Sequence, residues 1–213
     1  MIRTILFDLD ETLYPRGVGI MNQIRLLILE YVCNRLGLPE PEADTLRQVY
    51  LRDYGTTMRG LQLNHQIDTD DYLDYVHKIQ LDRYLEANPE LDAALATLPQ
   101  EKVVFTNASR EHAEAVLAVL GVGHHFARIV DVRDMGFESK PQPSAYQRIC
   151  QMLGCLPEEC VLVEDNVRNL LPAKALGMVT ILVGENGVQA GGGIDYVISR
   201  VEEIGEVLAR ITR

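Results

Sequence analysis

The feature that most constrains the fold is a series of short apolar runs that end in polar residues and alternate with helical patterns. Runs rich in branched and aromatic side chains are typical of strands buried on both faces of a parallel sheet. We predict strands at Ile2–Asp8, Lys102–Thr106, Cys160–Glu164 and Met178–Val183, with a weaker one at Arg128–Val132 and a short one at Tyr196–Ser199. Helical patterns follow at Glu111–Leu120, Ser144–Leu153, Val167–Leu176 and about 201–211. This alternation predicts an α/β fold with a doubly wound parallel sheet.

Residues 15–88 interrupt the alternation, because they contain no convincing strand. Helical patterns occur there at 20–36 and 42–53, and a third is possible near 69–85. We therefore predict a discontinuous core of residues 1–14 and 89–213, with an inserted α-helical segment at 15–88 directly after the first strand. The glycines at 184, 187 and 191–193 do not form GxGxxG before a helix, so we expect a surface turn there and no dinucleotide site.

Charge and hydropathy exclude several classes of partner. The 213-residue chain has a formal net charge of −11 and no run of Lys or Arg, so we expect binding neither to nucleic acid nor to an anionic membrane. Its longest apolar stretches, such as Val179–Val183, are far shorter than the roughly 20 residues that a membrane-spanning helix needs. The first residues reach Asp8 before a signal-like apolar region forms, which predicts a cytoplasmic protein. Cysteines 33, 150, 155 and 160 lack paired CxxC spacing, and we predict that they pack as small hydrophobes.

Acidic side chains follow two of the predicted strands. The first strand ends in Asp8-Leu9-Asp10, and the Cys160–Glu164 strand ends in Glu164-Asp165. Ligands of a doubly wound sheet bind outside the carboxyl ends of its strands, so these acids would meet at one edge. Several carboxylates in such a place repel one another unless a cation neutralises them. Because all the donors are oxygen atoms, the pattern favours Mg²⁺.

The same residues suit phosphoryl transfer. The carboxylate of Asp8 can attack phosphorus to form an aspartyl phosphate, while Asp10 protonates the leaving oxygen and later activates water. Thr106, Asn107 and neighbouring backbone N–H groups can hold phosphate oxygens, and the ammonium group of Lys140 can offset the negative charge. Each residue alone would be explained as a helix cap, a turn or a surface group. Their joint order at separate strand ends favours the functional interpretation.

The segments Asp8-x-Asp10-x-Thr12, Thr106 after a strand, Lys140-Pro141 and Glu164-Asp165 resemble the four ordered motifs of the haloacid dehalogenase superfamily. The resemblance implies a Rossmann-like core and makes the insertion a small helical cap that closes over the site. It also implies that Mg²⁺ is bound by the carboxylates of Asp8 and Asp165 and by the backbone carbonyl of Asp10, with Glu164 beside or in that shell. The chain departs from many relatives in carrying Asn169 where they have a further Asp.

The second acid bears on the reaction class. The dehalogenase branch of the superfamily lacks it, so Asp10 favours phosphoryl transfer, and the resemblance favours a phosphatase over a sugar-phosphate mutase. A phospho-accepting signalling switch is the non-enzyme alternative, because receiver domains also group acids, Thr or Ser and Lys around Mg²⁺. Such domains are phosphorylated on an acid after the third strand and have no insertion after the first strand. This difference disfavours the signalling-switch hypothesis.

Substrate selection is expected to come from the insertion. Two glycines and two threonines interrupt the helical period in Tyr54–Leu61, which predicts a substrate-facing loop with Tyr54 and Arg59 as contacts. This stretch, with Leu13-Tyr14-Pro15 and Asp74-Tyr75-Val76-His77, resembles the pyrimidine 5′-nucleotidase subfamily. The resemblance also rests on Phe105-Thr106-Asn107-Ala108 and His112. The resemblance implies a nucleoside monophosphate as the small-molecule phosphate ester, with another small metabolite as the alternative, because relatives with similar insertions act on other phosphate esters. We expect a monomer or a homodimer. Among the histidines, we predict a special role for His77. We predict that three others are surface or capping groups, namely His112, His124 and His125.

Overall fold

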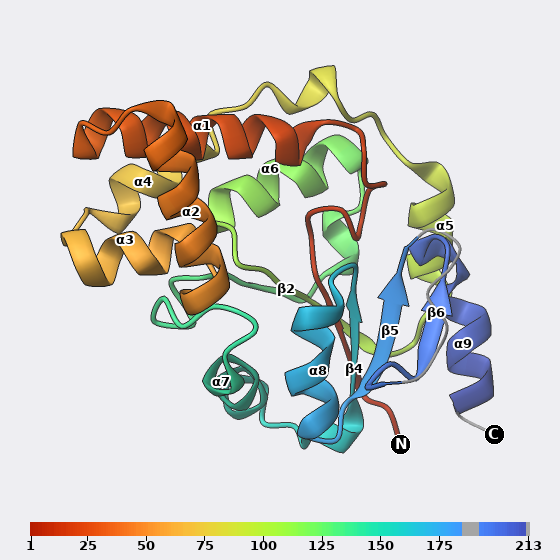
Figure 1. The fold of residues 1–213 in the computed structure, drawn as a ribbon. Coiled ribbons are helices and arrows are strands. Elements are labelled where there is room, and N and C mark those ends of the chain that lie inside the picture. Colours follow the sequence, from red (N-terminus) through yellow and green to blue (C-terminus); the bar gives the residue numbers. More distant parts are fainter. Residues whose placement is uncertain (185–191, 212–213) are drawn as a thin grey trace.

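The computed structural model of the protein describes residues 1–184 and 192–211. Its centre is a six-stranded sheet with the order β3-β2-β1-β4-β5-β6, in which every neighbouring pair is parallel (Figure 1). The strands are β1 (Thr4–Phe7), β2 (Glu101–Phe105), β3 (Arg128–Val130), β4 (Cys160–Glu164), β5 (Val179–Val183) and β6 (Tyr196–Ile198). The predicted doubly wound α/β fold is confirmed, with the two halves diverging from β1 and β4 at its centre.

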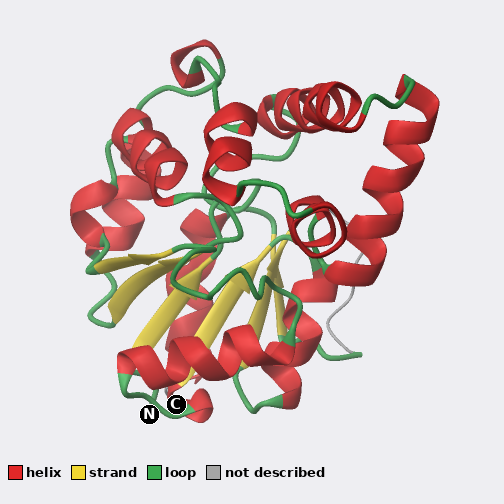
Figure 2. Cartoon of the chain, turned by 90° about the vertical axis from the view of Figure 1, so that its left-hand side faces the viewer, coloured by secondary structure: helices red, strands yellow, loops and turns green. Residues whose placement is uncertain are grey.

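Alternate side chains of the strands point to two helical layers. Ile5 and Phe7 belong to a core cluster with α5 (Pro89–Ala96), α6 (Arg110–Leu120) and α9 (Ile204–Ile211). Leu6 belongs to a second cluster with α7 (Pro143–Leu153) and α8 (Val167–Ala175). This division follows from the two-residue period of a strand, which sends successive side chains to opposite faces. Figure 2 shows the strands enclosed by helices.

The inserted segment forms a helical group of its own, which lies beside the sheet in Figure 1. It consists of α1 (Ile20–Leu36), α2 (Glu40–Tyr54), α3 (Thr57–His65) and α4 (Thr69–Val76). The four helices share an apolar cluster that includes Tyr31, Tyr50 and Tyr72. The rings of Tyr31 and Tyr72 meet edge to face, with 5.1 Å between their centroids. Tyr31 and Tyr50 therefore pack inside the helical group and do not face the sheet.

The prediction of a loop at Tyr54–Leu61 is wrong, because α3 begins at Thr57. The hydroxyl group of Thr56 accepts a hydrogen bond from the backbone N–H of Arg59 at 3.2 Å and so caps the new helix. Gly60 lies within α3, and only a glycine fits there because the ring of Tyr50 packs on it. A Cβ atom at Gly60 would lie 2.2 Å from the Cγ of Tyr50. The glycine that resembles a helix breaker in the sequence permits close helix packing in the fold.

The last helical pattern of the insertion divides into α4 and the 3₁₀ turn η1 (Leu81–Arg83). Leu81 and Leu85 pack in the apolar cluster that also contains α6, on the sheet side of the molecule. Other short 3₁₀ turns are η2 (Gly123–His125), η3 (Pro157–Glu159) and η4 (Val201–Glu203). Gly187 and Gly191 of the predicted glycine turn lie outside the described residues. Among the helices in the described ranges, none combines the length and the apolar character that a membrane crossing requires.

Candidate active site

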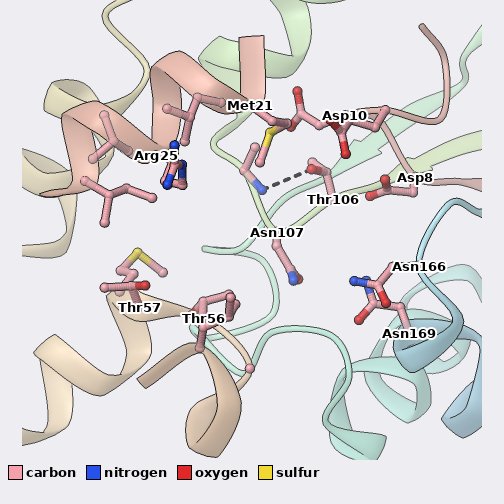
Figure 3. Close-up of a pocket in the computed structure, with 18 of the residues that line it drawn as sticks. Asp8, Asp10, Met21, Arg25, Thr56, Thr57, Thr106, Asn107, Asn166 and Asn169 are labelled. Atoms are coloured by element: carbon pink, nitrogen blue, oxygen red, sulfur yellow. Dashed lines mark hydrogen bonds between the residues drawn. The ribbon is translucent and has the colours of Figure 1, made fainter. Parts of the chain in front are cut away.

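Residues from separate strand ends meet at one cavity of about 540 Å³ (Figure 3). Asp8 follows β1, and its backbone N–H donates to the carbonyl of Val163 in β4 at 2.9 Å, which extends the sheet ladder into the site. Thr106 follows β2 and Asp165 follows β4, and both line the same cavity as Asp8 and Asp10. The carboxyl edge of the sheet therefore brings together acids that the sequence separates by more than 150 residues.

Lys140 connects two of the buried acids. Its Nζ donates to Oδ1 of Asp8 at 2.7 Å and to Oε2 of Glu164 at 2.8 Å, and its side chain is 1% exposed. Asn107 fixes the backbone of the lysine, because its side chain donates to the carbonyl of Lys140 and accepts from the N–H of Lys140, each at 2.9 Å. Asn107, predicted as a substrate contact, lines the cavity and also positions Lys140.

The buried acids of the site carry more negative charge than the neighbouring cations offset. Burial, together with the charge of Glu164, raises the pKa of Asp8 from its ordinary 3.8 to about 7, although Lys140 acts in the opposite direction. Burial also raises the pKa of Glu164. Burial opposes the charged form of Lys140, but Asp8 and Glu164 outweigh it and raise the lysine pKa. Arg16 pairs with Asp165 and lowers its pKa, yet burial still raises the pKa of that carboxyl. Lys140 and Arg16 together thus do not offset the buried negative charge.

The donor set fits Mg²⁺. Carboxylate oxygens of Asp8, Glu164 and Asp165 lie within 4.8 Å of one another, and oxygen is the donor that this cation prefers. Glu164 is held by protein donors, since Oε1 accepts from the N–H of Asn166 and Oε2 accepts from Asn169, each at 3.1 Å, as well as from Lys140. Asp8 accepts one hydrogen bond on each oxygen, from Lys140 and Thr12, and Asp165 accepts one from Arg16 on Oδ2, so these two carboxylates have fewer protein donors than Glu164. Asn169, which differs from the usual Asp of the resembled motif, orients Glu164.

Asp10 has a hydrogen-bonded support of its own. Its Oδ1 accepts from the hydroxyl group of Tyr14 at 2.5 Å and lies 2.9 Å from Nε2 of His112. Burial alone would raise the pKa of Asp10, but His112 and Tyr14 hold it below its ordinary value. The prediction that His112 is a surface or capping group is wrong, because the residue is 3% exposed. Its place on the apolar face of α6, one turn before Val116, is the sequence signal that would have found it.

The comparisons with known proteins agree with this geometry. A model of the haloacid dehalogenase-like hydrolases matches residues 2–177. The chain belongs to this hydrolase family. It is 27% identical to a phosphoglycolate phosphatase of Aquifex aeolicus over 97% of both chains. It is 26% identical to Phosphate metabolism protein 8 of Saccharomyces cerevisiae over 83% of this chain but only 60% of that protein. A crystal structure of a HAD phosphatase from Thermococcus onnurineus superposes with a TM-score of 0.66 at 20% identity, covering 97% of this chain and 98% of the other.

His77 connects the helical group of this hydrolase to the sheet core. Its Nδ1 lies 3.1 Å from the hydroxyl oxygen of Ser109, and its ring stacks on that of His112 with 4.5 Å between centroids. Burial, together with the charge of His112, lowers the pKa of His77 to about 3. His77 therefore stays neutral at the junction, where it lines the cavity, while His112 is the imidazole in contact with Asp10. By contrast, Nε2 of both His124 and His125 faces Asp92, away from the cavity.

Two predicted substrate contacts of the insertion do not line the cavity. The ring of Tyr54 packs on that of Tyr50 at 5.6 Å between centroids, and the guanidinium group of Arg59 donates to Gln62 at 2.7 Å. We do not retain a substrate role for Tyr54 or Arg59. The helical wall of the cavity instead includes Thr56 and Thr57, at the start of α3, and Met21 and Arg25 of α1 (Figure 3). Met58 of α3 also lines it.

The insertion lies directly on the loops of the hydrolase core. Arg168 in the first turn of α8 donates to the carbonyls of Leu51 and Arg52, at 2.8 and 2.7 Å, near the end of α2. Gly55 approaches the next loop so closely that a Cβ atom there would lie 3.0 Å from Cδ of Pro141. The helical group is thus held over the cavity by hydrogen bonds and backbone packing from both α8 and the Lys140 loop.

Proposed function

We propose that the protein is a Mg²⁺-dependent phosphatase that hydrolyses small phosphate monoesters through an aspartyl phosphate on Asp8. The observation that carries this proposal is the pair of acids at the cavity, with Asp8 bonded to Lys140 and Asp10 bonded to Tyr14 and His112. The two carboxylates have different surroundings, which suits one to attack phosphorus and the other to move protons.

In the first step an oxygen of Asp8 bonds to phosphorus while the ester P–O bond breaks and Asp10 gives its proton to the leaving alcohol. In the second step Asp10 takes a proton from water, the water oxygen attacks phosphorus, and phosphate leaves with Asp8 restored. The lowered pKa of Asp10 leaves it ionised in the free protein, as the second step requires. The first step therefore requires that the negative charge of the bound phosphate ester raises this pKa, so that Asp10 takes up a proton from solvent before it gives one to the leaving alcohol. Mg²⁺, held by Asp8 and Asp165, would offset the charge of the phosphoryl group.

Thr106 is placed to bind the phosphoryl group. Its hydroxyl oxygen accepts a hydrogen bond from the N–H of Ala108 at 3.0 Å, drawn as the dashed line in Figure 3, and its own hydrogen can donate to a phosphate oxygen. Its backbone N–H donates a hydrogen bond to the carbonyl of Val130 at 3.1 Å, which fixes the residue at the strand end. The side chain of Thr106 is therefore aimed by the sheet, independently of the insertion.

The preferred substrate in this proposal is a nucleoside monophosphate, as the resemblance of the insertion to pyrimidine 5′-nucleotidases implies. A cavity of about 540 Å³ lies within the roughly 300–1,000 Å³ of ligand pockets. Met58, Tyr72 and Val76 supply an apolar wall on which a base could pack, while the acids lie on the opposite wall.

One observation favours a second candidate, a small phosphate ester that carries a further anionic group. Arg25 points into the cavity (Figure 3) and makes no ion pair with any residue of the described ranges. Arg47 also lines the cavity, but Asp44 pairs with it at 2.8 Å. The Aquifex aeolicus relative is named phosphoglycolate phosphatase, and phosphoglycolate carries a carboxylate beside its phosphate ester.

Phosphate release from a panel of esters tests the proposal. Purified protein with Mg²⁺ should turn over UMP, CMP or 2-phosphoglycolate, and a chelator should stop it. Asp8→Asn should lower turnover by at least about a thousandfold, because the nucleophile is lost, and mass spectrometry of rapidly quenched wild type should find phosphate on Asp8. Retained activity in Asp8→Asn, or full activity in chelator, would contradict the mechanism. Isomerisation without phosphate release would indicate a mutase, and stable stoichiometric phosphorylation a signalling switch.

Arg25→Met separates the two substrate classes. If Arg25 binds a second anion, its loss should raise the KM for 2-phosphoglycolate roughly tenfold or more and leave that for UMP nearly unchanged. Arg59→Met is the matched control, because Arg59 lies in the same helical group but outside the cavity wall. An equal effect of both substitutions would argue against a specific role for Arg25.

A further inference from the structure

Three of the four cysteines meet at the edge of the sheet opposite the acidic site. Cys150 lies in α7, Cys155 follows that helix, and Cys160 is the first residue of β4 (Figure 1). One Sγ atom from each lies within 4.8 Å of the others, and those of Cys155 and Cys160 are 3.2 Å apart. All three thiols are free. The CxxC rule applied to the sequence does not detect this group, because its members are five residues apart.

The backbone builds the group. Gly154 ends α7 in the left-handed region with φ of 61°, which turns the chain back toward the sheet. The N–H of Cys155 then donates to the carbonyl of Cys150 at 3.1 Å, and the thiol of Cys160 donates to the carbonyl of Leu156 at 3.4 Å. Main-chain contacts of the α7–β4 connection therefore hold the three thiols together.

The environment of the thiols is suited to ligand chemistry. Hydrogen bonding from Cys160 and Cys155 outweighs burial and lowers the pKa of Cys150 to about 7. Burial raises the pKa of Cys155, and the hydrogen bond with Cys150 together with burial raises that of Cys160, so these two thiols give up their protons only on binding the cation. A thiolate, and not a thiol, is the form that binds a metal. Cys150 and Cys160 are buried whereas Cys155 is half-buried, so the group is open to solvent on one side. The separation of 3.2 Å is well beyond the S–S bond length of about 2.05 Å, which leaves the sulfur atoms free to bind.

We propose that Cys150, Cys155 and Cys160 form a binding site for one thiophilic cation, and that Cu(I) fits it best. Sulfur-only donors select soft cations over hard ones such as Mg²⁺. Structural Zn²⁺ takes four protein ligands, whereas the cluster within the described residues offers three. Each thiol that binds Cu(I) releases its proton to solvent, so the step needs neither an oxidant nor a reductant. The site lies at the opposite edge of the sheet from Asp8 and is independent of the proposed phosphatase activity.

An anaerobic competition titration tests the site. Reduced full-length protein is titrated with Cu(I) in the presence of a coloured Cu(I) chelator, and the copper withdrawn from the chelator is measured by absorbance. Wild type should bind one equivalent, and Cys155→Ser should bind at least tenfold more weakly. Cys33→Ser is the matched control, because Cys33 is a free cysteine of α1 outside the cluster, and it should bind like wild type.

Folding is checked separately. Cys155→Ser changes one sulfur atom at a half-buried position, and its circular dichroism and phosphate release should match those of wild type. Cu(I) should raise the unfolding temperature of wild type but not that of Cys155→Ser, because only a site present in the folded state stabilises it. Equal Cu(I) binding by wild type and folded Cys155→Ser, loss of binding in Cys33→Ser, or tighter binding of Zn²⁺ than of Cu(I) would overturn the proposal.

Discussion

The two walls of the cavity differ in how their charges are satisfied. On the sheet side, the Lys140 ammonium group is buried and bonded to both Asp8 and Glu164. On the helical side, Arg25 is exposed and makes no ion pair with any residue that the structure describes. The cation of the sheet wall is already paired with two protein acids, whereas the helical wall carries a cation that a ligand can still engage. This difference suggests that the chemistry belongs to the sheet and the choice of substrate to the helices.

The difference has a structural cause. Asp8, Thr106 and Asp165 of the sheet wall directly follow strands, so the hydrogen-bonded ladder sets their positions, as the bond from Asp8 to Val163 shows. Lys140 lies in the connection after β3 and is held there by Asn107. The helical wall is attached mainly by side chains, among them Arg168 on the end of α2 and Arg133, which donates to Asp70 of α4 at 2.6 Å. Substitutions in the sheet wall should therefore remove activity, and substitutions at the junction should change binding.

The largest effect is expected for Lys140→Met. Removing the ammonium group leaves Asp8 and Glu164 as buried, unpaired charges, which should cost about 3–5 kcal/mol of unfolding free energy and abolish phosphate release. Urea unfolding in chelator measures the first effect. Lys174→Met, which breaks an exposed pair with Asp195, should cost less than about 1 kcal/mol. Adding Glu164→Gln to Lys140→Met should restore part of the stability but no activity, and unchanged stability in the single variant would contradict the comparison.

A smaller effect is expected for His112→Gln. The substitution removes the imidazole that lies 2.9 Å from Asp10 but leaves the hydroxyl group of Tyr14 in place. We expect kcat to fall by roughly 10–100-fold, because proton transfer by a positioned acid contributes about 10²–10⁴-fold in total. KM should change little, since His112 does not line the cavity. His125→Gln is the control, and a purely KM effect in His112→Gln would show that the residue does not act through Asp10.

The junction itself is tested by Arg168→Gln. Loss of the two bonds to the end of α2 should loosen the helical group over the cavity and raise KM by roughly 3–10-fold, with a smaller change in kcat. Arg200→Gln breaks an exposed ion pair with Glu90, away from the cavity, and should leave both constants unchanged. Steady-state phosphate release distinguishes the two. If Arg168→Gln lowered kcat alone, the junction would not control substrate binding.

The smallest effect concerns stability in acid and His77. The folded state keeps this imidazole neutral down to a pKa of about 3, whereas the unfolded chain takes up a proton near the ordinary 6.5. Stability should therefore fall as the pH drops from 6.5 toward 3, by about 1 kcal/mol at pH 5.5. His77→Gln should flatten this part of the curve, and exposed His124→Gln should not. Unfolding midpoints across this range provide the measurement, and identical slopes in the three proteins would contradict the assignment.

Much of the fold could be predicted from local patterns. Buried strands are recognisable as apolar runs, and the predicted strand positions agree with β1 to β6. The predicted helix ends at Leu120 and Leu153 agree with those of α6 and α7. The same rules failed at Gly60, where a glycine is needed because the ring of Tyr50 from another helix packs on it. They failed at His112 as well, because a histidine on an apolar face reveals its partner only when Asp10 is brought beside it.

The sequence by itself determined the doubly wound sheet and the acids at its carboxyl edge, because the strand period, the helix stops and the residues after each strand are properties of short segments. Only the tertiary structure decided which side chains meet. It joined Asp10 to His112, used Asn107 to hold Lys140, placed Arg25 instead of Arg59 in the cavity wall and gathered three thiols at the opposite edge. Such contacts depend on packing between segments distant in sequence, and no local period encodes them.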